Sequence, residues 1–566
     1  IIDEYHALTI IKELLKELKL KIPPQDALRE ISLLKNNIQQ WAGSEKGEPP
    51  LPDLQKMTPR DARSVSKGAK SASFDRLYAA YCSQLERYGL MDYDDILLAV
   101  LHGFRCREGE ETAQEGISDS FFHLLVDEFQ DINTVQYHLI KEWSKKSESI
   151  FIIGDPDQSI YGFRGSDFRF FERFLNDFPG LRLIRLTQHY RSTPEIINCA
   201  QTVLSTKKAG NLAYALETKR ERGAKVRLIT TEDELSEAVF VAKEINRMVG
   251  GIDMLDTQTL SAPRKSKATA KHPRGFSEIA VLYRTNRQAE ILEQCLSKEG
   301  IQYVVVGRDD FLAEQPVRET IAFLRFLLNP GDLASLLVCL QNGGIFTAEQ
   351  QQKVLESYAA SNKSLSSLIR IMEVAGLPPQ KEDKLQEFIA MLQKYEPMVK
   401  QKRPGEIIAS LINDNGLSGM RCMELLLDTS VMYEDTVSFI HNLLLGQESD
   451  IVRSGNRKYS SDAVSLMTIH SAKGLEFPVV FLCGVNDGTI PLKKGRSGFH
   501  TDIDEERRLF YVGITRAQDE LILLTGRNPS PFINDISGIP EVQLETESRS
   551  TSKQKAQYKQ VSLFEI

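Results

Sequence analysis

Apolar residues in the first part of the chain recur at the spacing of a helix, with lysine and glutamate on the opposite side. The shared apolar face is made by Leu8, Ile11, Leu15 and Leu18. The segment Phe74–Gly89 has the same spacing, and the acidic run at 91–95 follows it like the start of a further helix, where the dipole is positive. Residues 1–110 are therefore predicted to be helical.

From about residue 120 the pattern changes to short apolar runs, rich in Val, Ile and Leu, that end in polar, glycine-containing turns. Such runs, separated by helical stretches, indicate the strands of parallel sheets in an α/β fold. The predicted strands are Phe122–Val126, Ile150–Ile153, Leu181–Leu186, Lys225–Ile229, Ile279–Tyr283, Tyr303–Val306, Val464–Ile469, Val479–Cys483 and Leu521–Leu524. A mostly helical stretch at about 316–455 interrupts the second set, and the polar residues 540–560 are predicted to be disordered.

Composition narrows the class of protein. The 566 residues carry a formal net charge of −8, so any binding of nucleic acid needs a local groove. The basic stretch 257–275 is interpreted as a solvated linker. Seven cysteines form no Cys-x-x-Cys pair, which disfavours zinc and disulfide frameworks and fits a reducing cytoplasm. No apolar run predicts a membrane span, so we expect a cytoplasmic protein without a membrane partner.

The segment 124–131 delivers two carboxylates to the end of a predicted strand, where ligands bind in α/β sheets. Nucleotide hydrolysis needs one carboxylate to hold Mg²⁺ and a base to orient and deprotonate water. Asp127 could supply the metal ligand and Glu128 the base. Acidic residues at strand ends also serve as helix caps, and for this pair alone that alternative stays open.

The segment 154–165 follows the next predicted strand and places polar, aromatic and basic side chains at close spacing. Gln158 could sense a γ-phosphate. Tyr161 and Phe163 could stack on bases while Arg164 contacts the nucleic-acid backbone. The alternative is that both rings belong to the core, although their polar, glycine-flanked setting argues against it.

Together these two segments resemble motifs II and III of superfamily 1 helicases, in the UvrD/Rep/PcrA branch. Gln188–Ser192 is similar to motif IV, Val464–Phe477 to motif V and Glu505–Ala517 to motif VI. The chain departs from the usual wording at His189, where Asn is common, and at Phe163, where Trp is common. Phenylalanine offers a smaller stacking face than tryptophan.

The resemblance implies roles at the nucleotide. Tyr190 would stack on adenine, and Arg191 and Arg516 would reach the γ-phosphate. Gly474 and Glu476 would bind ATP, the glutamate at the ribose. Planar guanidinium groups suit the charge that phosphoryl transfer builds on the equatorial oxygens. If both arginines meet one nucleotide, its hydrolysis can open and close a cleft between two domains, as a motor requires. The region of His470 would link DNA contacts to the nucleotide.

The resemblance also implies an architecture of two RecA-like parallel-sheet domains, the first incomplete, with helical insertions. The expected parts are a helical 1B-like subdomain at 1–115, the C-terminal part of domain 1A at 116–187, the first part of domain 2A at 188–330, a helical 2B-like insertion at 331–458, the second part of domain 2A at 459–535, and a disordered tail at 536–566.

A P-loop needs Gly-x-x-x-x-Gly-Lys-Ser/Thr after a strand, and the sequence contains no such string. The nearest, Ser64–Ser71, has Ser64 and Ala69 where the glycines belong. In the family the P-loop precedes everything seen in this chain, so we expect an N-terminal truncation. Without the lysine and the backbone N–H cradle, these residues alone should bind ATP poorly.

The C-terminus carries a separate short pattern. Gln560, Leu563 and Phe564 lie in a string that resembles the motif by which bacterial DNA-processing proteins dock on the sliding clamp. A free tail with an apolar end suits a pocket on a partner. The alternative is an ordinary disordered tail.

The leading hypothesis is an ATP- and Mg²⁺-dependent DNA helicase that moves 3′ to 5′ on single-stranded DNA, acts on partly duplex DNA, and serves repair or replication. The competing hypothesis is a DNA- or clamp-binding protein without a P-loop and without ATPase activity. A helicase–nuclease subunit is disfavoured because too little chain follows Arg516 to hold a nuclease domain.

Overall fold

The computed structural model describes residues 1–2, 4–36, 72–87, 89–106, 121–205, 216–250, 273–306, 311–341, 344–374, 379–445, 462–493 and 502–546. Ser64–Ser71, most of the basic stretch and the tail motif therefore lie outside the described residues. The chain divides into two compact units. Unit 1 comprises Ile1–Arg182 and Val306–Ser460, and unit 2 comprises Leu183–Val305 and Ser461–Ile566.

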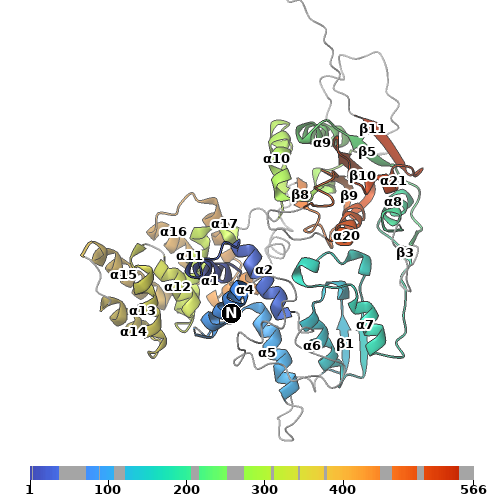
Figure 1. Ribbon diagram of the computed structural model, residues 1–566. Coiled ribbons are helices and arrows are strands. Elements are labelled where there is room, and N and C mark those ends of the chain that lie inside the picture. The colour runs from blue at the N-terminus through green and yellow to red at the C-terminus, as the bar shows by residue number, and fades with distance from the viewer. Residues whose placement is uncertain are drawn as a thin grey trace, which may run out of the picture. The chain divides into compact units, whose positions relative to one another are not determined.

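The described residues of unit 1 up to 106 form four helices, which confirms the helical prediction for them (Figure 1). They are α1 (Glu4–Glu17), α2 (Pro24–Asn36), α4 (Ala72–Arg87) and α5 (Tyr93–Cys106). Ile11 and Leu15 of α1 are buried with Ile31 of α2 and Leu77 of α4 in one cluster. The apolar spacing that predicted the first helix is thus the face that packs.

A buried lysine ties these helices together. Lys35 at the end of α2 donates to Asp92 at 2.7 Å and to Asp95 at 2.6 Å, and its side chain is 1% exposed. Tyr81 of α4 donates to Asp92 as well, at 3.1 Å. Burial lowers the pKa of Lys35, but the two carboxylates outweigh it and hold the pKa above its ordinary value. The acidic run expected to begin a helix therefore also neutralises a buried cation.

A two-stranded parallel sheet follows, made of β1 (His123–Val126) and β2 (Ser149–Ile152). Helices α6 (Thr134–Ser144) and α7 (Phe170–Asp177) accompany it, and a cluster around Phe129 and Phe174 covers one face of the strands. The other face is open, since Leu125 is 71% exposed. Both strands confirm the predicted runs.

The third predicted strand of this sheet, Leu181–Leu186, is wrong: residues 181–187 form no strand. A strand needs a neighbouring backbone to complete its hydrogen bonds, and this run pairs with neither β1 nor β2. Its apolar side chains are correspondingly uncovered, with Leu186 80% exposed. An apolar run predicts a strand only where a partner is in reach.

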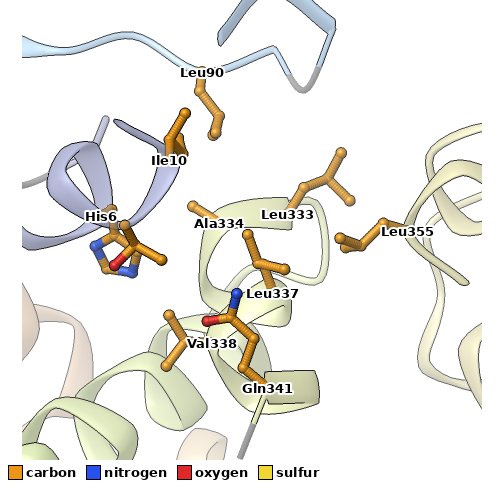
Figure 2. A pocket seen from close by; sticks show the side chains of 10 residues that line it. His6, Ile10, Leu90, Leu333, Ala334, Leu337, Val338, Gln341 and Leu355 are labelled. Atoms are coloured by element: carbon orange, nitrogen blue, oxygen red, sulfur yellow. The ribbon is translucent and has the colours of Figure 1, made fainter. Parts of the chain in front are cut away.

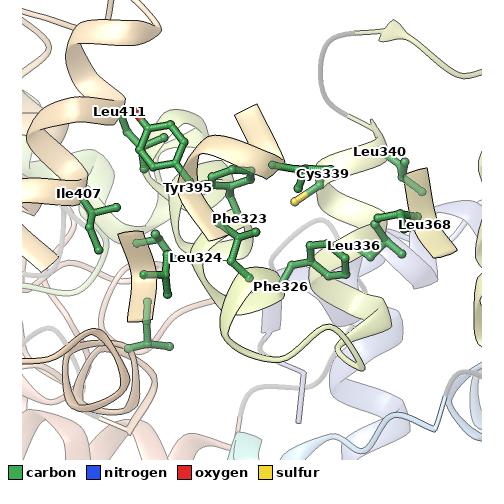
Figure 3. Close-up of a cluster of buried hydrophobic side chains, with 14 of the residues drawn as sticks. Phe323, Leu324, Phe326, Leu336, Cys339, Leu340, Leu368, Tyr395, Ile407 and Leu411 are labelled. Atoms are coloured by element: carbon green, nitrogen blue, oxygen red, sulfur yellow. The ribbon is translucent and has the colours of Figure 1, made fainter. Parts of the chain in front are cut away.

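The stretch predicted to be helical contains helices throughout its described residues. They are α11 (Gln315–Leu328), α12 (Leu333–Gln341), α13 (Ala348–Ala359), α14 (Leu365–Glu373), α15 (Pro379–Gln401), α16 (Pro404–Asp414), α17 (Arg421–Ser430) and α18 (Thr436–Leu445). Their core gathers Phe323, Phe326, Leu336 and Tyr395 (Figure 3). Helix α11, within the range expected for the second sheet domain, packs in this core instead. None of the described helices combines the length and apolarity needed to span a membrane.

The inserted helices meet the N-terminal helices within unit 1. Arg325 of α11 donates to the carbonyl of Ile1 at 3.1 Å, and Ala334 of α12 joins the N-terminal cluster. A small pocket remains at this junction, where His6 and Ile10 of α1 face α12 (Figure 2). Its lining is chiefly aliphatic, which fits imperfect packing between helices better than a site for chemistry.

Unit 2 is built on a parallel sheet that has, within the described residues, the strand order β11-β5-β10-β9-β6-β8-β7. The strands are β5 (Val226–Thr230), β6 (Ile279–Tyr283), β7 (Tyr303–Val305), β8 (Val464–Thr468), β9 (Phe477–Leu482), β10 (Ala517–Thr525) and β11 (Val542–Thr546). Every predicted strand of the second set is present. A separate pair, β3 (Gln188–His189) and β4 (Glu217–Thr218), lies outside this sheet.

Helices cover both faces of the sheet (Figure 1). Helices α9 (Glu234–Val249) and α10 (Ala289–Lys298) share a buried cluster with β6, β8 and β9. Helices α8 (Pro194–Ser205) and α20 (Ile503–Ile514) contact β10, and the short α21 (Ile533–Ile536) contacts α8. A parallel sheet covered on both faces is the architecture that its continuous apolar strands predict.

The prediction of disorder is wrong for Val542–Thr546, which is strand β11 and pairs in parallel with β5. The segment Val-Gln-Leu-Glu-Thr alternates apolar and polar residues, as an edge strand does. The residues that follow it are mostly polar, so this short alternation does not stand out in the sequence. Arg227 of β5 also pairs with Glu545 at 2.9 Å, a contact between distant residues.

A buried carboxyl marks the end of β9. Glu237 of α9 accepts a hydrogen bond from the backbone N–H of Gly484 at 2.6 Å and is 5% exposed. Burial raises the pKa of Glu237 to about 7, and the hydrogen bonds from Gly484 and the Cys483 thiol only partly counter it. The folded state therefore favours the protonated acid.

Replacing the buried lysine should destabilise unit 1. A Lys35→Met substitution leaves Asp92 and Asp95 without their cation, which typically costs about 3 to 5 kcal/mol of unfolding free energy. Chemical denaturation followed by circular dichroism measures this loss. Lys12→Met on the exposed face of α1 is the matched control, expected to shift stability by no more than about 0.5 kcal/mol. Equal effects of both variants would contradict the role given to Lys35.

The pKa of Glu237 predicts a pH-dependent stability of unit 2. Because the folded pKa lies above the unfolded one, the unfolded state loses its proton first, and stability falls as pH rises between about 4.5 and 7. The loss amounts to about 3 kcal/mol. Glu237→Gln keeps the acceptor for Gly484 without titrating, so its thermal unfolding should lack this component between pH 5 and 8. The exposed Glu232→Gln, just before the same helix, should keep the wild-type slope; a shared slope in all three proteins would refute the assignment.

Candidate functional site

The two carboxylates predicted for hydrolysis lie at the carboxyl end of β1. Asp127 and Glu128 are both exposed, and the backbone N–H of Glu128 donates to Oδ1 of Asp127 at 2.8 Å. Glu128 adopts a left-handed backbone with φ 51°, which a non-glycine residue takes at a cost.

Gln130 fixes this turn, a role that the sequence analysis did not assign. Its side chain is buried, its Nε2 donates to Oε2 of Glu128, and its Oε1 accepts from the backbone N–H of Asp155 at 2.9 Å. One amide therefore joins the end of β1 to the segment after β2. A Cβ on Gly154 would come within 2.5 Å of Oε1 of Gln130, so this close approach requires glycine.

Gln158, the predicted γ-phosphate sensor, lies on the same edge. Its Nε2 donates to Oδ2 of Asp155 at 2.8 Å, and the other oxygen of Asp155 accepts from the N–H of Asp157 at 3.0 Å. Ser159 closes the segment by donating to the carbonyl of Gln130 at 3.1 Å. The structure thus brings together Asp127, Glu128 and the Gln158 segment within unit 1.

The predicted DNA residues form an aromatic and cationic cluster just beyond this edge. The rings of Tyr161 and Phe163 pack edge to face with centroids 5.9 Å apart. The Arg164 guanidinium lies 5.9 Å from the first centroid and 5.7 Å from the second. Both rings are half-buried, so neither is a core aromatic. Burial, and then the negative charges of Asp131 and Glu128, raise the pKa of Tyr161, which places this ring beside the acidic turn.

In unit 2 the predicted nucleotide residues gather around an ion pair. Nε of Arg191 donates to Oε2 of Glu476 at 2.5 Å, and its Nη1 donates to the carbonyl of Thr515 at 3.2 Å. Gln518, which the sequence analysis missed, donates to the other oxygen of Glu476 at 3.0 Å. The hydrogen bond from Arg191 holds the pKa of Glu476 below its ordinary value. Tyr190 is 78% exposed, as a ring that stacks on a ligand must be.

Arg516 has a different environment. Its side chain is 1% exposed, and it donates to the carbonyls of Val512 at 3.0 Å and Leu475 at 3.2 Å. Its Nη2 also donates to Oγ1 of Thr515 at 3.1 Å. The guanidinium in this structure is thus directed at backbone carbonyls of unit 2 rather than at open surface.

The turn after β8 carries the remaining predicted residues. His470 and Gly474 lie in a compact turn in which the N–H of Lys473 donates to the carbonyl of His470 at 3.2 Å. Gly474 has φ 80°, a left-handed conformation that glycine adopts without strain. Glu476 follows two residues later, so the turn helps to determine where that carboxylate lies.

The backbone that carries Arg191 is held from two sides. The N–H of Ser192 donates to Nδ1 of His189 at 3.2 Å, so this histidine provides the acceptor that an asparagine would provide. Burial, and then the charge of Arg191, lower the pKa of His189, which keeps the ring neutral and accepting. Arg220 donates to the carbonyl of Arg191, and at 2.7 Å to Asp519. No motif signals Arg220, because its partners are distant in sequence.

Two protein-family models match this chain. The family model described as the UvrD/REP helicase N-terminal domain matches residues 1–179. The model of the UvrD-like helicase C-terminal domain matches 184–375 and 345–528. Together these matches include the segments that resemble helicase motifs II to VI, whereas the tail motif at 560–564 lies beyond them.

Curated relatives align over nearly the whole chain. The ATP-dependent DNA helicase PcrA of Bacillus subtilis is 30% identical over 604 aligned residues, with 98% of this chain and 75% of that protein covered. The proteins of the same name from Staphylococcus epidermidis ATCC 12228 and Staphylococcus aureus Mu50 are each 28% identical, and the matches cover 99% and 98% of this chain and 75% and 74% of theirs. The chain therefore belongs to the UvrD/REP family of helicases.

Proposed function

We propose that this chain carries motor residues of an ATP-dependent DNA helicase that translocates 3′ to 5′ along single-stranded DNA in repair or replication. The observation that carries the proposal is the arrangement in unit 1, where an acidic strand end and an aromatic, cationic cluster lie side by side. The first suits nucleotide hydrolysis and the second suits stacked bases. The relatives of the same family are named ATP-dependent DNA helicases.

Asp127 is proposed to hold Mg²⁺, and its setting fits that ion. It is an exposed carboxylate at a strand end, and Mg²⁺ prefers one or two such oxygens together with waters and substrate phosphates. The ion would neutralise charge that develops on the transferred phosphoryl group. Glu128 then orients and deprotonates water, with Gln130 fixing its direction. Gln158 completes this set at the γ-phosphate.

Unit 2 supplies the second set of residues. Tyr190 stacks on adenine, Glu476 and Gly474 bind the nucleoside side, and the guanidinium of Arg191 stabilises the equatorial oxygens. Arg516 would join it once its guanidinium leaves the carbonyls that it contacts in this structure. In this structure Arg191 is engaged by Glu476. Nucleotide binding in this scheme therefore exchanges the ion pair for a contact of Arg191 with phosphate and of Glu476 with ribose. The pair is partly exposed, so breaking it costs little.

DNA is proposed to contact Tyr161, Phe163 and Arg164 through stacked bases and backbone phosphates, with His470 linking those contacts to the nucleotide. The formal net charge of −8 makes this local concentration of guanidinium and aromatic groups necessary. The sliding clamp remains a proposal that rests on Gln560, Leu563 and Phe564 in the sequence alone.

Exchanging one ring tests the proposed DNA site. Phe163→Ala in the 566-residue chain should weaken binding of a labelled oligo(dT) about fivefold or more, since stacking on one base is worth about 1 to 3 kcal/mol. Phe163→Trp offers a larger face and should strengthen binding. Phe122→Ala, which removes a 65% exposed phenylalanine from unit 1, is the matched control and should bind as the wild type does. Fluorescence anisotropy measures all four affinities; unchanged binding by both Phe163 variants would exclude this ring from the site.

The printed sequence contains no Gly-x-x-x-x-Gly-Lys-Ser/Thr string, so we propose that these 566 residues alone hydrolyse ATP at close to the background rate. A phosphate-release assay with and without oligo(dT) checks this, with Glu128→Gln as the companion variant. The two proteins should be indistinguishable. A DNA-stimulated rate that the variant loses would refute this inactivity and support the role of Glu128, whereas a stimulated rate that survives in the variant would contradict that role.

A further inference from the structure

We propose that Arg29 of α2 is a further DNA-contacting residue, which binds a backbone phosphate beside the ring of Phe163. The inference rests on the proposed DNA-binding function and extends its site onto a second element of unit 1. The observation is that the Arg29 guanidinium lies over the Phe163 ring, 5.9 Å from its centroid. No motif includes this arginine.

Arg29 and Arg164 reach the same ring from two elements. The second guanidinium lies 5.7 Å from the Phe163 centroid and belongs to the short 3-10 helix Gly162–Arg164. A ring accompanied by two cations matches a single strand, in which bases that stack alternate with phosphates that carry charge. Arginine also stacks on ring faces while its outer N–H groups still bind phosphate.

Contacts other than that of the Arg29 guanidinium also place α2 against this 3-10 helix. Gly165 has φ 87°, and a Cβ there would lie 3.6 Å from Leu33 and 4.0 Å from Asn36, both on α2. Asn36 is itself anchored by donating to Asp94 at 2.7 Å. The helix therefore packs directly on the segment that carries the predicted DNA residues, and Arg29 lies one turn before this contact.

The two cationic residues of α2, Arg29 and Lys35, have different surroundings. The lysine is buried and engaged by Asp92 and Asp95, so it contributes little field at the surface. Arg29 is half-buried, which lets its stem pack on apolar surface while its head stays at the ring. Of these two cations on α2, Arg29 is the one placed to meet a phosphate.

The test is a double-mutant cycle on oligo(dT) binding by the 566-residue chain, with affinity measured over a series of salt concentrations. Arg29→Gln should weaken binding about fivefold and lower the slope of log affinity against log salt by about 0.7, the value for one phosphate contact on a single strand. Most of this effect should persist when Phe163 is already alanine. Arg29→Lys should keep the slope, and Arg370→Gln on α14 controls for loss of one positive charge.

Three outcomes would overturn the inference. If Arg29→Gln binds with the wild-type affinity and slope while Phe163→Ala is impaired, the DNA site stands and Arg29 is not part of it. If the effect of Arg29→Gln disappears in the Phe163→Ala background, the arginine only positions the ring. If the wild type binds no oligonucleotide, the proposed function itself fails and the inference falls with it. Circular dichroism of each variant separates these outcomes from loss of folding. Arg29→Met, which also removes the charge, provides the second substitution if the glutamine variant does not fold.

Discussion

The buried amide of Gln130 is the contact on which the acidic edge of unit 1 depends. It donates to Glu128 and accepts from the backbone of Asp155, so one planar group sets the distance between two strand ends. A buried amide that loses either partner carries a desolvation cost of about 1 to 3 kcal/mol. The arrangement also needs Gly154, because a side chain there would displace the amide oxygen. The strained backbone of Glu128 is held by this neighbourhood rather than by its own preference.

In unit 2 an ion pair and hydrogen bonds, rather than a buried amide, fix the position of a candidate site residue. Arg191 could adopt many rotamers, yet Glu476 and the Thr515 carbonyl fix its guanidinium, while Arg220 fixes its carbonyl. Each partner comes from another segment of the chain, so the position of the arginine depends on the tertiary fold of unit 2. The ion pair is half-exposed and of modest strength, which suits a contact that a ligand has to replace. A fully buried pair would resist that exchange.

Sequence patterns predicted those parts of the fold that depend on residues close together in the sequence. Continuous apolar runs identified β1, β2 and the strands β5 to β10. In the sheet of unit 2 the runs are apolar because buried parallel strands must be apolar on both faces. They failed at Leu181–Leu186, where apolar residues lack a pairing strand, and at Val542–Thr546, where pairing with β5 stabilises a largely polar segment.

The candidate site also divides into features that local sequence predicts and features that depend on tertiary contacts. The segments that carry Asp127, Gln158 and the aromatic cluster could be predicted because strand ends and turn residues are local signals. Gln130 lay inside a predicted motif, but its bridging role depends on a residue 25 positions away. Arg220 and Arg29 carry no local signal at all, since each is defined by a partner on another element. Local patterns therefore identify a site, and tertiary contacts complete it.

The stretch from Asp127 to Gly165 brings the groups proposed for hydrolysis and for base stacking into one electrostatic environment. Tyr161 feels the charges of Asp131 and Glu128 on one side and that of Arg164 on the other. On the proposed function, a DNA phosphate drawn to Arg164 would offset that cation and change the field at the acidic turn over a few ångströms. Coupling between DNA and nucleotide then needs no long pathway inside unit 1, because the Tyr161 ring lies where the two sets of charges meet. The hydrogen bond from Ser159 to the carbonyl of Gln130 keeps the acidic turn and the aromatic cluster at a fixed separation.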